Sequence, residues 1–324
     1  MKRHVAHWFL VWAGLLLSSH SALAQDYPNK PIKLVVGYVP GGSPDSLARI
    51  LGEQLTQILG QQIIVDNRPG AGGTLASAAV AKAPADGYTL MVGETGQMVI
   101  APYLMKGLPY DPVKDFTPIG LVGSTPLVLA VNPKASKLKT VQDLIREAKA
   151  NPGKLSYGSS GIGSIHHVAA EVFKADAGID LLHVPYKGTG QSVPGLLAGD
   201  VPVLMTSLTG VLSHVRAGTV NLLAVSSATR YPGTPDTPTI GETIKGYDYS
   251  SEMGILAPAN LPPPILDKLV KAVREAAGRP DLQEKMKAAS IIVNVGTPEA
   301  YAENIRQNLK KYERAVKLAN VQAN

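Results

Sequence analysis

The stretch of sequence that decides the fold reads Tyr27-Pro-Asn-Lys-Pro-Ile-Lys-Leu-Val-Val-Gly-Tyr-Val-Pro-Gly-Gly-Ser-Pro-Asp-Ser-Leu-Ala-Arg49. Its residues 32–36 are mostly apolar and β-branched, which is typical of a buried strand. The turn Pro40-Gly41-Gly42 ends that strand, because glycine accepts backbone angles that other residues avoid. The stretch therefore predicts a strand, a tight turn and a following helix.

The start of this helix is a potential anion site. Ser43 is the expected N-cap, Pro44 the first helical residue and Asp45 an acid in the first turn. Such a helix start directs unpaired N–H groups and a partial positive charge out of the end of a sheet, where a carboxylate can bind. Two alternatives stay open. The turn can be a plain strand-to-helix connection, and Asp45 can stabilise the helix dipole, orient a water or accept from an amino group of a ligand.

The rest of the chain alternates between strand-like and helical patterns. This alternation predicts an α/β fold built from βαβ units with a largely parallel sheet. Strands are expected at 32–36, 63–65, 89–92, 127–131, 155–158, 182–184, 201–205 and 222–225, and helices at 46–59, 74–83, 98–105, 141–150, 165–177, 192–198, 265–277, 281–289 and 298–318.

A second turn of the same kind spans residues 157–164. It follows an expected strand, contains the adjacent hydroxyls of Ser159 and Ser160 and the flexible Gly161, and opens a helix with Ser164 as N-cap. It too can be a simple capped turn. If the two helix starts face each other across a cleft, they suit a ligand with two anionic groups.

The N-terminus predicts export. Lys2 and Arg3 precede an apolar core at 8–17, and Ala22-Leu23-Ala24 is a small-x-small cleavage site. We expect residues 1–24 to be a signal peptide cut near Ala24/Gln25, and the mature protein to reside in the periplasm. A retained membrane anchor is the alternative, but the apolar core falls short of the roughly 20 residues that span a bilayer.

Composition narrows the possible functions. The chain has 31 basic and 25 acidic residues. This mild, scattered excess of positive charge favours an acidic ligand and gives no support for nucleic-acid binding. The chain has no cysteine, which excludes thiolate metal sites, iron–sulfur clusters and cysteine nucleophiles. The histidines show no metal-ligand spacing, so we expect no metal and no cofactor.

The motifs together resemble the Bug family, the periplasmic receptors of tripartite tricarboxylate transporters. The resemblance covers nearly all of the chain after about residue 25. It rests on Tyr27-Pro28, Lys30-Pro31-Ile32, Pro40-Gly41-Gly42, Asp45 and Ala48-Arg49, followed by Val65-Asp66-Asn67-Arg68-Pro69-Gly70-Ala71-Gly72-Gly73, Ala85-Asp86-Gly87-Tyr88-Thr89-Leu90, Tyr157-Gly158-Ser159-Ser160-Gly161, Gly163-Ser164-Ile165-His166 and Val184-Pro185-Tyr186-Lys187-Gly188.

The resemblance implies a two-lobed periplasmic binding protein fold (type II, Venus-flytrap) with a ligand cleft between the lobes. Lobe 1 is expected at 25–124 and 253–324 and lobe 2 at 125–252, with crossings near 121–127 and 250–257. In the family, the loop that corresponds to Pro40-Gly41-Gly42 holds a ligand carboxylate through backbone amides, partly through water. The Gly70–Gly73 turn is framework there.

Several further residues follow or end expected strands, where ligands of open α/β sheets bind. The expected ligand-binding set is Tyr38, Pro40, Gly41, Gly42, Asp45, Thr95, Ser159, Ser160, Gly161, Ser164, His166, Tyr186, Thr206 and Glu252. Glu252 stands where the family usually has an aromatic residue, often Trp. An acid there would repel a second carboxylate or attract an ammonium group.

The sequence therefore predicts a solute-binding protein that captures a di- or tricarboxylate, an aromatic acid or an amino acid. We expect a monomer that passes its ligand to subunits of an inner-membrane tripartite transporter. One alternative is an exported α/β hydrolase that uses Ser160 or Ser159 with His166, although Ile162 breaks the Gly-x-Ser-x-Gly elbow. Another is a ligand sensor, which differs only in its partner.

Overall fold

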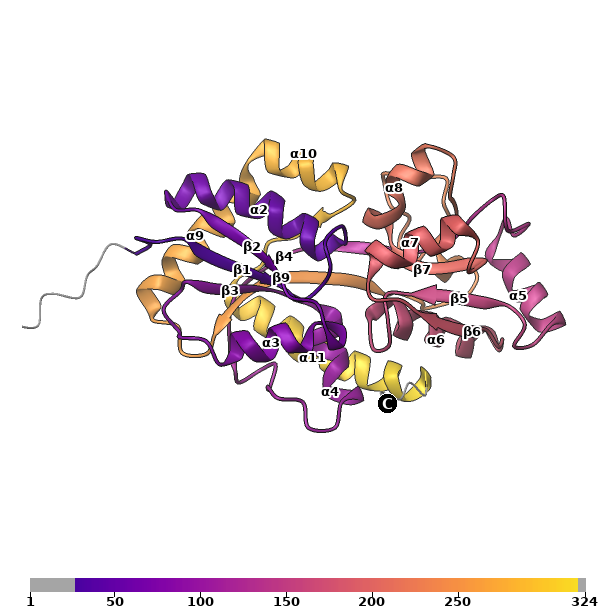
Figure 1. The fold of residues 1–324 in the computed structure, drawn as a ribbon, viewed down its shortest axis with the longest axis horizontal. Coiled ribbons are helices and arrows are strands. Elements are labelled where there is room, and N and C mark those ends of the chain that lie inside the picture. Colours follow the sequence, from indigo (N-terminus) through magenta and orange to yellow (C-terminus); the bar gives the residue numbers. More distant parts are fainter. Residues whose placement is uncertain (1–26, 320–324) are drawn as a thin grey trace, which may run out of the picture.

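The computed structural model describes residues 27–319 (Figure 1). The expected signal peptide and cleavage site lie outside these residues. Within the described range, no helix combines the length and the apolar character needed to cross a bilayer.

The strands of the described chain form one ten-stranded sheet. Its order is β2-β1-β3-β9-β4-β7-β5-β6, with β8 and β10 also paired to β4. The strand bounds are β1 Ile32–Val36, β2 Ile63–Asn67, β3 Thr89–Glu94, β4 Phe116–Val131, β5 Ser156–Ser159, β6 Leu182–Pro185, β7 Val203–Ser207, β8 Asn221–Val225, β9 Ser250–Pro258 and β10 Ile292–Val293.

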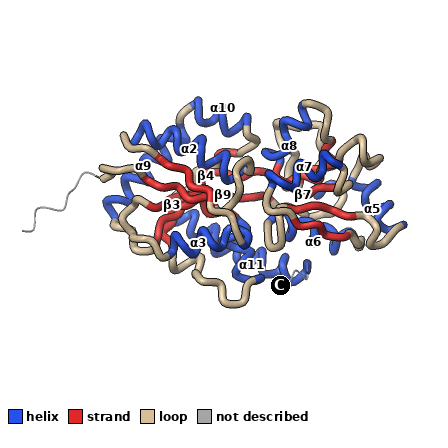
Figure 2. The backbone as a smooth tube through the Cα atoms, in the orientation of Figure 1, coloured by secondary structure: helices blue, strands red, loops and turns tan. Residues whose placement is uncertain are grey.

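Helices cover both faces of the sheet (Figure 2). The α-helices are α2 Ser43–Leu59, α3 Thr74–Ala81, α4 Ala101–Leu104, α5 Val141–Ala150, α6 Ile165–Ala177, α7 Thr189–Ala198, α8 Leu208–Arg216, α9 Pro263–Gly278, α10 Pro280–Ala288 and α11 Pro298–Ala319. Shorter helical turns are η2 Ala71–Gly73, η3 Gly96–Ile100 and η4 Ile240–Glu242.

The prediction of a largely parallel sheet is correct only at the two ends. β1 pairs in parallel with β2 and β3, and β5 with β6 and β7. The centre is antiparallel, because β9 lies between β3 and β4 and pairs with both in that sense. The sequence patterns missed this centre because they indicated neither β9 nor the first half of β4 as a strand.

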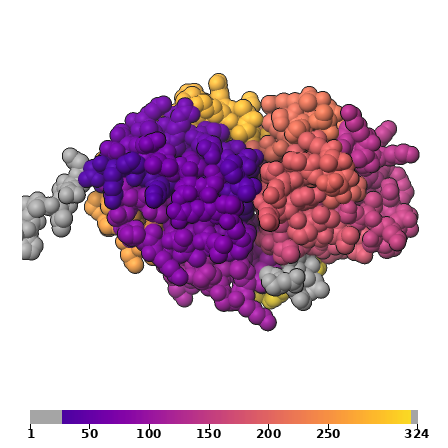
Figure 3. All heavy atoms as spheres, in the orientation of Figure 1, coloured from indigo at the N-terminus to yellow at the C-terminus, as the bar shows by residue number. Residues whose placement is uncertain are grey.

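Strand β4 joins the two halves of the molecule. It pairs with β9 from Phe116 to Pro126 and with β7 from Leu127 to Val131. Three apolar clusters fill the layers. One lies among β1, β3, β9, α2 and α9, another among β4, β7, α7 and α8, and a third extends from α3 and η3 through α11 to α6. In Figure 3 the two halves meet along a seam. The lobe boundaries given above stay a prediction.

Candidate functional site

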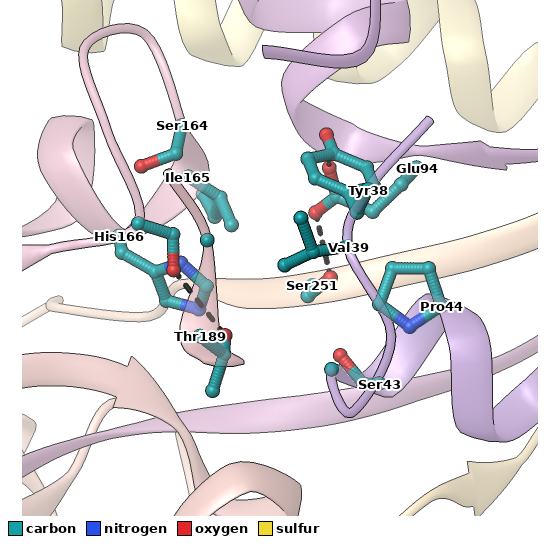
Figure 4. A pocket seen from close by; sticks show the side chains of 13 residues that line it. Tyr38, Val39, Ser43, Pro44, Glu94, Ser164, Ile165, His166, Thr189 and Ser251 are labelled. Carbon is teal, nitrogen blue, oxygen red and sulfur yellow. Dashed lines mark hydrogen bonds between the residues drawn. The ribbon is translucent and has the colours of Figure 1, made fainter. Parts of the chain in front are cut away.

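A cavity of about 390 Å³ lies where helices α2, α6 and α7 begin (Figure 4). One wall comes from the segment after β1, the start of α2, the end of β3 and the start of β9, and the other from the starts of α6 and α7. The lining residues are Tyr38, Val39, Gly42, Ser43, Pro44, Glu94, Ser160, Ser164, Ile165, His166, Gly188, Thr189 and Ser251. The described lining contains no Lys or Arg, so helix starts, amides and hydroxyls are the hydrogen-bond donors that it offers to an anion.

Helix α2 begins one residue earlier than the sequence predicted. Gly42, in an extended conformation, is the N-cap, and Ser43 is already helical and makes no capping bond. Asp45 organises this start, because its carboxylate accepts hydrogen bonds from Gly41 N (3.1 Å), Asn67 Nδ2 (3.0 Å) and Arg49 Nε (3.1 Å). Burial raises the pKa of Asp45, but these bonds and the Arg49 charge outweigh it and hold that pKa below its usual value.

These contacts place Asp45 in the framework of the helix start. Its carboxylate accepts the hydrogen bond of the Gly41 N–H, one of the amides that the sequence analysis expected to bind a ligand. Gly41 and Pro40 are exposed and do not line the cavity, whereas Gly42 is buried and does.

Helix α6 begins as the sequence predicted. Ser164 is its N-cap, with Oγ accepting from His167 N at 3.2 Å and donating to Gly161 O at 2.7 Å. Ser159 turns away from the cavity. Its fully buried hydroxyl lies 2.7 Å from His183 Nε2 and accepts from Gly161 N at 3.1 Å.

Helix α7 supplies a third helix start, which sequence reasoning missed. Its N-cap Gly188 has φ +118°, and both Gly188 and Thr189 line the cavity. Thr189 Oγ1 lies 3.3 Å from Ser160 Oγ. The sequence signal was present in the Lys187-Gly188-Thr189 turn, but the expected helix started only at residue 192.

His166 projects into the cavity from the first turn of α6 (Figure 4). Its side chain is 8% exposed, and neither ring nitrogen has a hydrogen-bond partner within the described chain. Burial lowers the pKa of His166 to about 4, so the ring is neutral near pH 7. A neutral imidazole offers one donor and one acceptor to a ligand.

Glu94 is the acid of the cavity, and sequence reasoning did not single it out. It ends β3 and is 4% exposed. Its carboxylate accepts from Tyr38 OH (2.6 Å), Ser251 Oγ (2.6 Å) and Gly96 N (2.7 Å). Tyr38 thus lies in the cavity wall, as expected from its place after β1.

Other expected residues lie elsewhere. Glu252 and Thr95 line a neighbouring cavity of about 210 Å³ against α11, where Glu252 Oε2 accepts from Asn308 Nδ2 at 2.5 Å and Thr95 Oγ1 accepts from Glu252 N at 2.9 Å. Thr206 is fully buried in β7 and its hydroxyl has no partner within residues 27–319.

A wider groove of about 1180 Å³ adjoins the cavity and shares Tyr38, Val39, Ser160 and Gly188 with it. Tyr186 and Gly161 line this groove, together with the Gly70–Gly73 turn, which the family resemblance treats as framework. The groove gives the cavity a glycine-rich entrance.

The geometry required for a serine hydrolase is not formed. Ser160 Oγ lies beside Thr189, and His166 bonds to no hydroxyl of the described chain. Ser159 does contact His183, but that serine is fully buried. The site instead has the character of a binding cavity, with convergent helix starts and hydroxyls and an apolar lining from Val39, Pro44 and Ile165.

The fold and the site together are those of the periplasmic-binding-protein class of ligand receptors. The sequence profile of the tripartite tricarboxylate transporter family receptors matches residues 47–321. The protein belongs to this family, and its resemblance to Bug proteins is confirmed. Protein BugT of Bordetella pertussis is 34% identical over 313 residues, which cover 95% of this chain and 94% of BugT.

Solved structures agree with this assignment. The periplasmic binding protein BugD superimposes with a TM-score of 0.86 at 33% identity, covering 91% of this chain and 99% of BugD. An R. palustris protein solved with adipate gives a TM-score of 0.88 at 32% identity, covering 91% of this chain and 99% of that one. The two-lobed α/β binding-protein fold is thereby confirmed.

Proposed function

We propose that the protein is a periplasmic receptor that captures a small carboxylate in the cavity at the starts of α2, α6 and α7. The observation that carries this proposal is the convergence of these helix starts on a cavity whose described lining has no Lys or Arg. Helix starts bind carboxylates through free N–H groups and a partial positive charge. The adipate in the R. palustris relative supports the same ligand chemistry.

Binding also explains the unpartnered ring of His166. A buried polar group without a hydrogen bond is unfavourable, so a ligand that bonds to the imidazole relieves that cost.

We further propose that the protein is exported with cleavage near Ala24/Gln25, acts as a monomer without enzymatic activity and passes its ligand to a tripartite transporter. The proposed ligand contacts are the cavity-lining residues named above.

The test is a thermal-shift screen of the protein without residues 1–24, refolded to remove any carried ligand. The panel holds small dicarboxylates, aromatic acids and amino acids, each with its uncharged amide or diamide as a matched control. A ligand at 100 times its Kd should stabilise the folded state by about 2.7 kcal/mol. The proposal fails if no carboxylate raises the melting temperature, or if the amides raise it equally.

A further inference from the structure

Glu94 places a hydrogen-bonded carboxyl group in the cavity wall. Tyr38, Ser251 and Gly96 come from three separate segments, and each directs a donor at its carboxylate. Donors around both oxygens are the environment of an ionised carboxylate, which can only accept. Burial raises the pKa of Glu94 above its usual value, and the hydrogen bonds from Ser251, Tyr38 and Gly96 oppose that rise by favouring the charged form.

The carboxylate keeps capacity for a ligand. Within the described chain, Oε2 accepts from Tyr38 and Gly96, while Oε1 accepts only from Ser251. Each carboxylate oxygen has about two acceptor positions, so one position on Oε1 remains. A ligand group that donates a hydrogen bond can use it, whereas a second ligand carboxylate would meet an unscreened like charge.

The opposite wall has the complementary chemistry. The starts of α6 and α7 and the neutral ring of His166 face Glu94 across the cavity (Figure 4). A ligand carboxylate is favoured on that side by helix N–H groups and by a donor nitrogen of His166. The described cavity lining offers no Lys or Arg that would neutralise a second carboxylate beside Glu94.

We propose that Glu94 is a specificity-determining residue that selects carboxylates bearing an ammonium group, with the ammonium at Glu94 and the carboxylate at the helix starts. Amino acids are then the substrate class, and plain dicarboxylates of equal length bind more weakly. This inference rests on the proposed function. It assigns to Glu94, which borders both cavities, the selectivity that the sequence assigned to Glu252, which lines only the neighbouring one.

The experiment compares pairs of ligands that differ only by an amino group, such as aspartate with succinate and glutamate with glutarate. Isothermal titration of the wild-type protein should show at least tenfold tighter binding for the amino member of one pair. In Glu94→Gln, which keeps shape and removes charge, that ratio should fall at least tenfold and the plain dicarboxylate should gain affinity. Glu252→Gln is the matched control and should leave the ratio unchanged.

Other outcomes overturn the inference. Plain dicarboxylates that bind the wild-type protein as tightly as their amino partners would refute it and leave the receptor function standing. So would an unchanged ratio in Glu94→Gln. The ratio of affinities for the two members of a pair is measured on the wild-type protein, so it tests the inference even if Glu94→Gln fails to fold. Failure of every carboxylate to bind would instead remove the proposed function itself.

Discussion

At the scale of single residues, the buried histidines of α6 make stability depend on pH. Burial lowers the pKa of His166 to about 4, and burial together with the nearby His183 and Lys174 lowers that of His167 to about 3. An unfolded histidine has a pKa near 6.5. Between about pH 6.5 and 4 the unfolded chain therefore binds more protons, and stability falls as the pH falls, by about 1.4 kcal/mol per pH unit for each histidine.

Urea unfolding of the ligand-free protein at pH 7, 6 and 5 tests this. His166→Phe should reduce the slope of unfolding free energy against pH by the contribution of one histidine. It should not lower the unfolding free energy at pH 7, because the ring nitrogens of His166 have no partner in the described chain. His167→Phe should reduce the slope equally but lower stability at pH 7, because His167 Nδ1 accepts from Gly163 N at 3.2 Å. Slopes equal to that of the wild-type protein in both variants would contradict the prediction.

At the scale of elements, the start of α7 approaches the loop before α2 across the cavity. A Cβ on Gly190 would lie 3.1 Å from the carbonyl oxygen of Pro40, and one on Gly188 would lie 2.7 Å from Val39 Cγ2. Gly190→Ala should strengthen α7, since alanine favours a helix by up to about 1 kcal/mol over glycine. It should also push the Pro40 loop away, and about 1 kcal/mol of cost to this arrangement of the cavity walls should weaken ligand binding about fivefold.

The matched control is Gly278→Ala at the end of α9, where an added Cβ has no atom within 4 Å. It should leave ligand affinity unchanged. Titration calorimetry gives the affinities and urea unfolding the stabilities. Equal affinity of Gly190→Ala and the wild-type protein would show that this approach does not govern binding.

The elements around the site were predictable to different degrees. The starts of α2 and α6 carry local signals, namely a Pro-Gly-Gly turn and a serine N-cap, and they were located to within one residue. Helix α8, strand β9 and the first half of β4 were missed. Pro118, Gly120 and Gly123 interrupt the apolar pattern of β4, and its strand character comes from pairing with β9.

The role of Glu94 could not be predicted for a related reason. Thr95, its neighbour in sequence, was expected in the site from its place after a strand, but nothing local singled out Glu94 itself. The bonding of Glu94 depends on Tyr38 after β1 and Ser251 in β9, both far away in sequence. Glu252 was noticed because it departs from the family pattern, but alternation along β9 directs it to the cavity against α11. Sequence patterns locate local turns well and contacts between distant segments poorly.

At the scale of the whole molecule, the halves share structure rather than being joined by loops. Strand β4 supplies hydrogen bonds to both parts of the sheet, and α11 packs against β4, η3 and α6. On the side of α10, Thr125 Oγ1 donates to Ser290 O at 3.0 Å and Thr209 Oγ1 to Ala289 O at 2.6 Å. Loss of either half would therefore expose apolar surface of the other.

Because of this shared structure, we expect the ligand-free protein to unfold in a single cooperative transition despite its two lobes. Differential scanning calorimetry should give a calorimetric enthalpy equal to the van't Hoff enthalpy, as two-state unfolding requires. A bound ligand should then move the entire transition to higher temperature, because binding to the folded state stabilises everything that unfolds with it. Two resolved transitions, of which the ligand shifts only one, would show that β4 and α11 do not couple the halves.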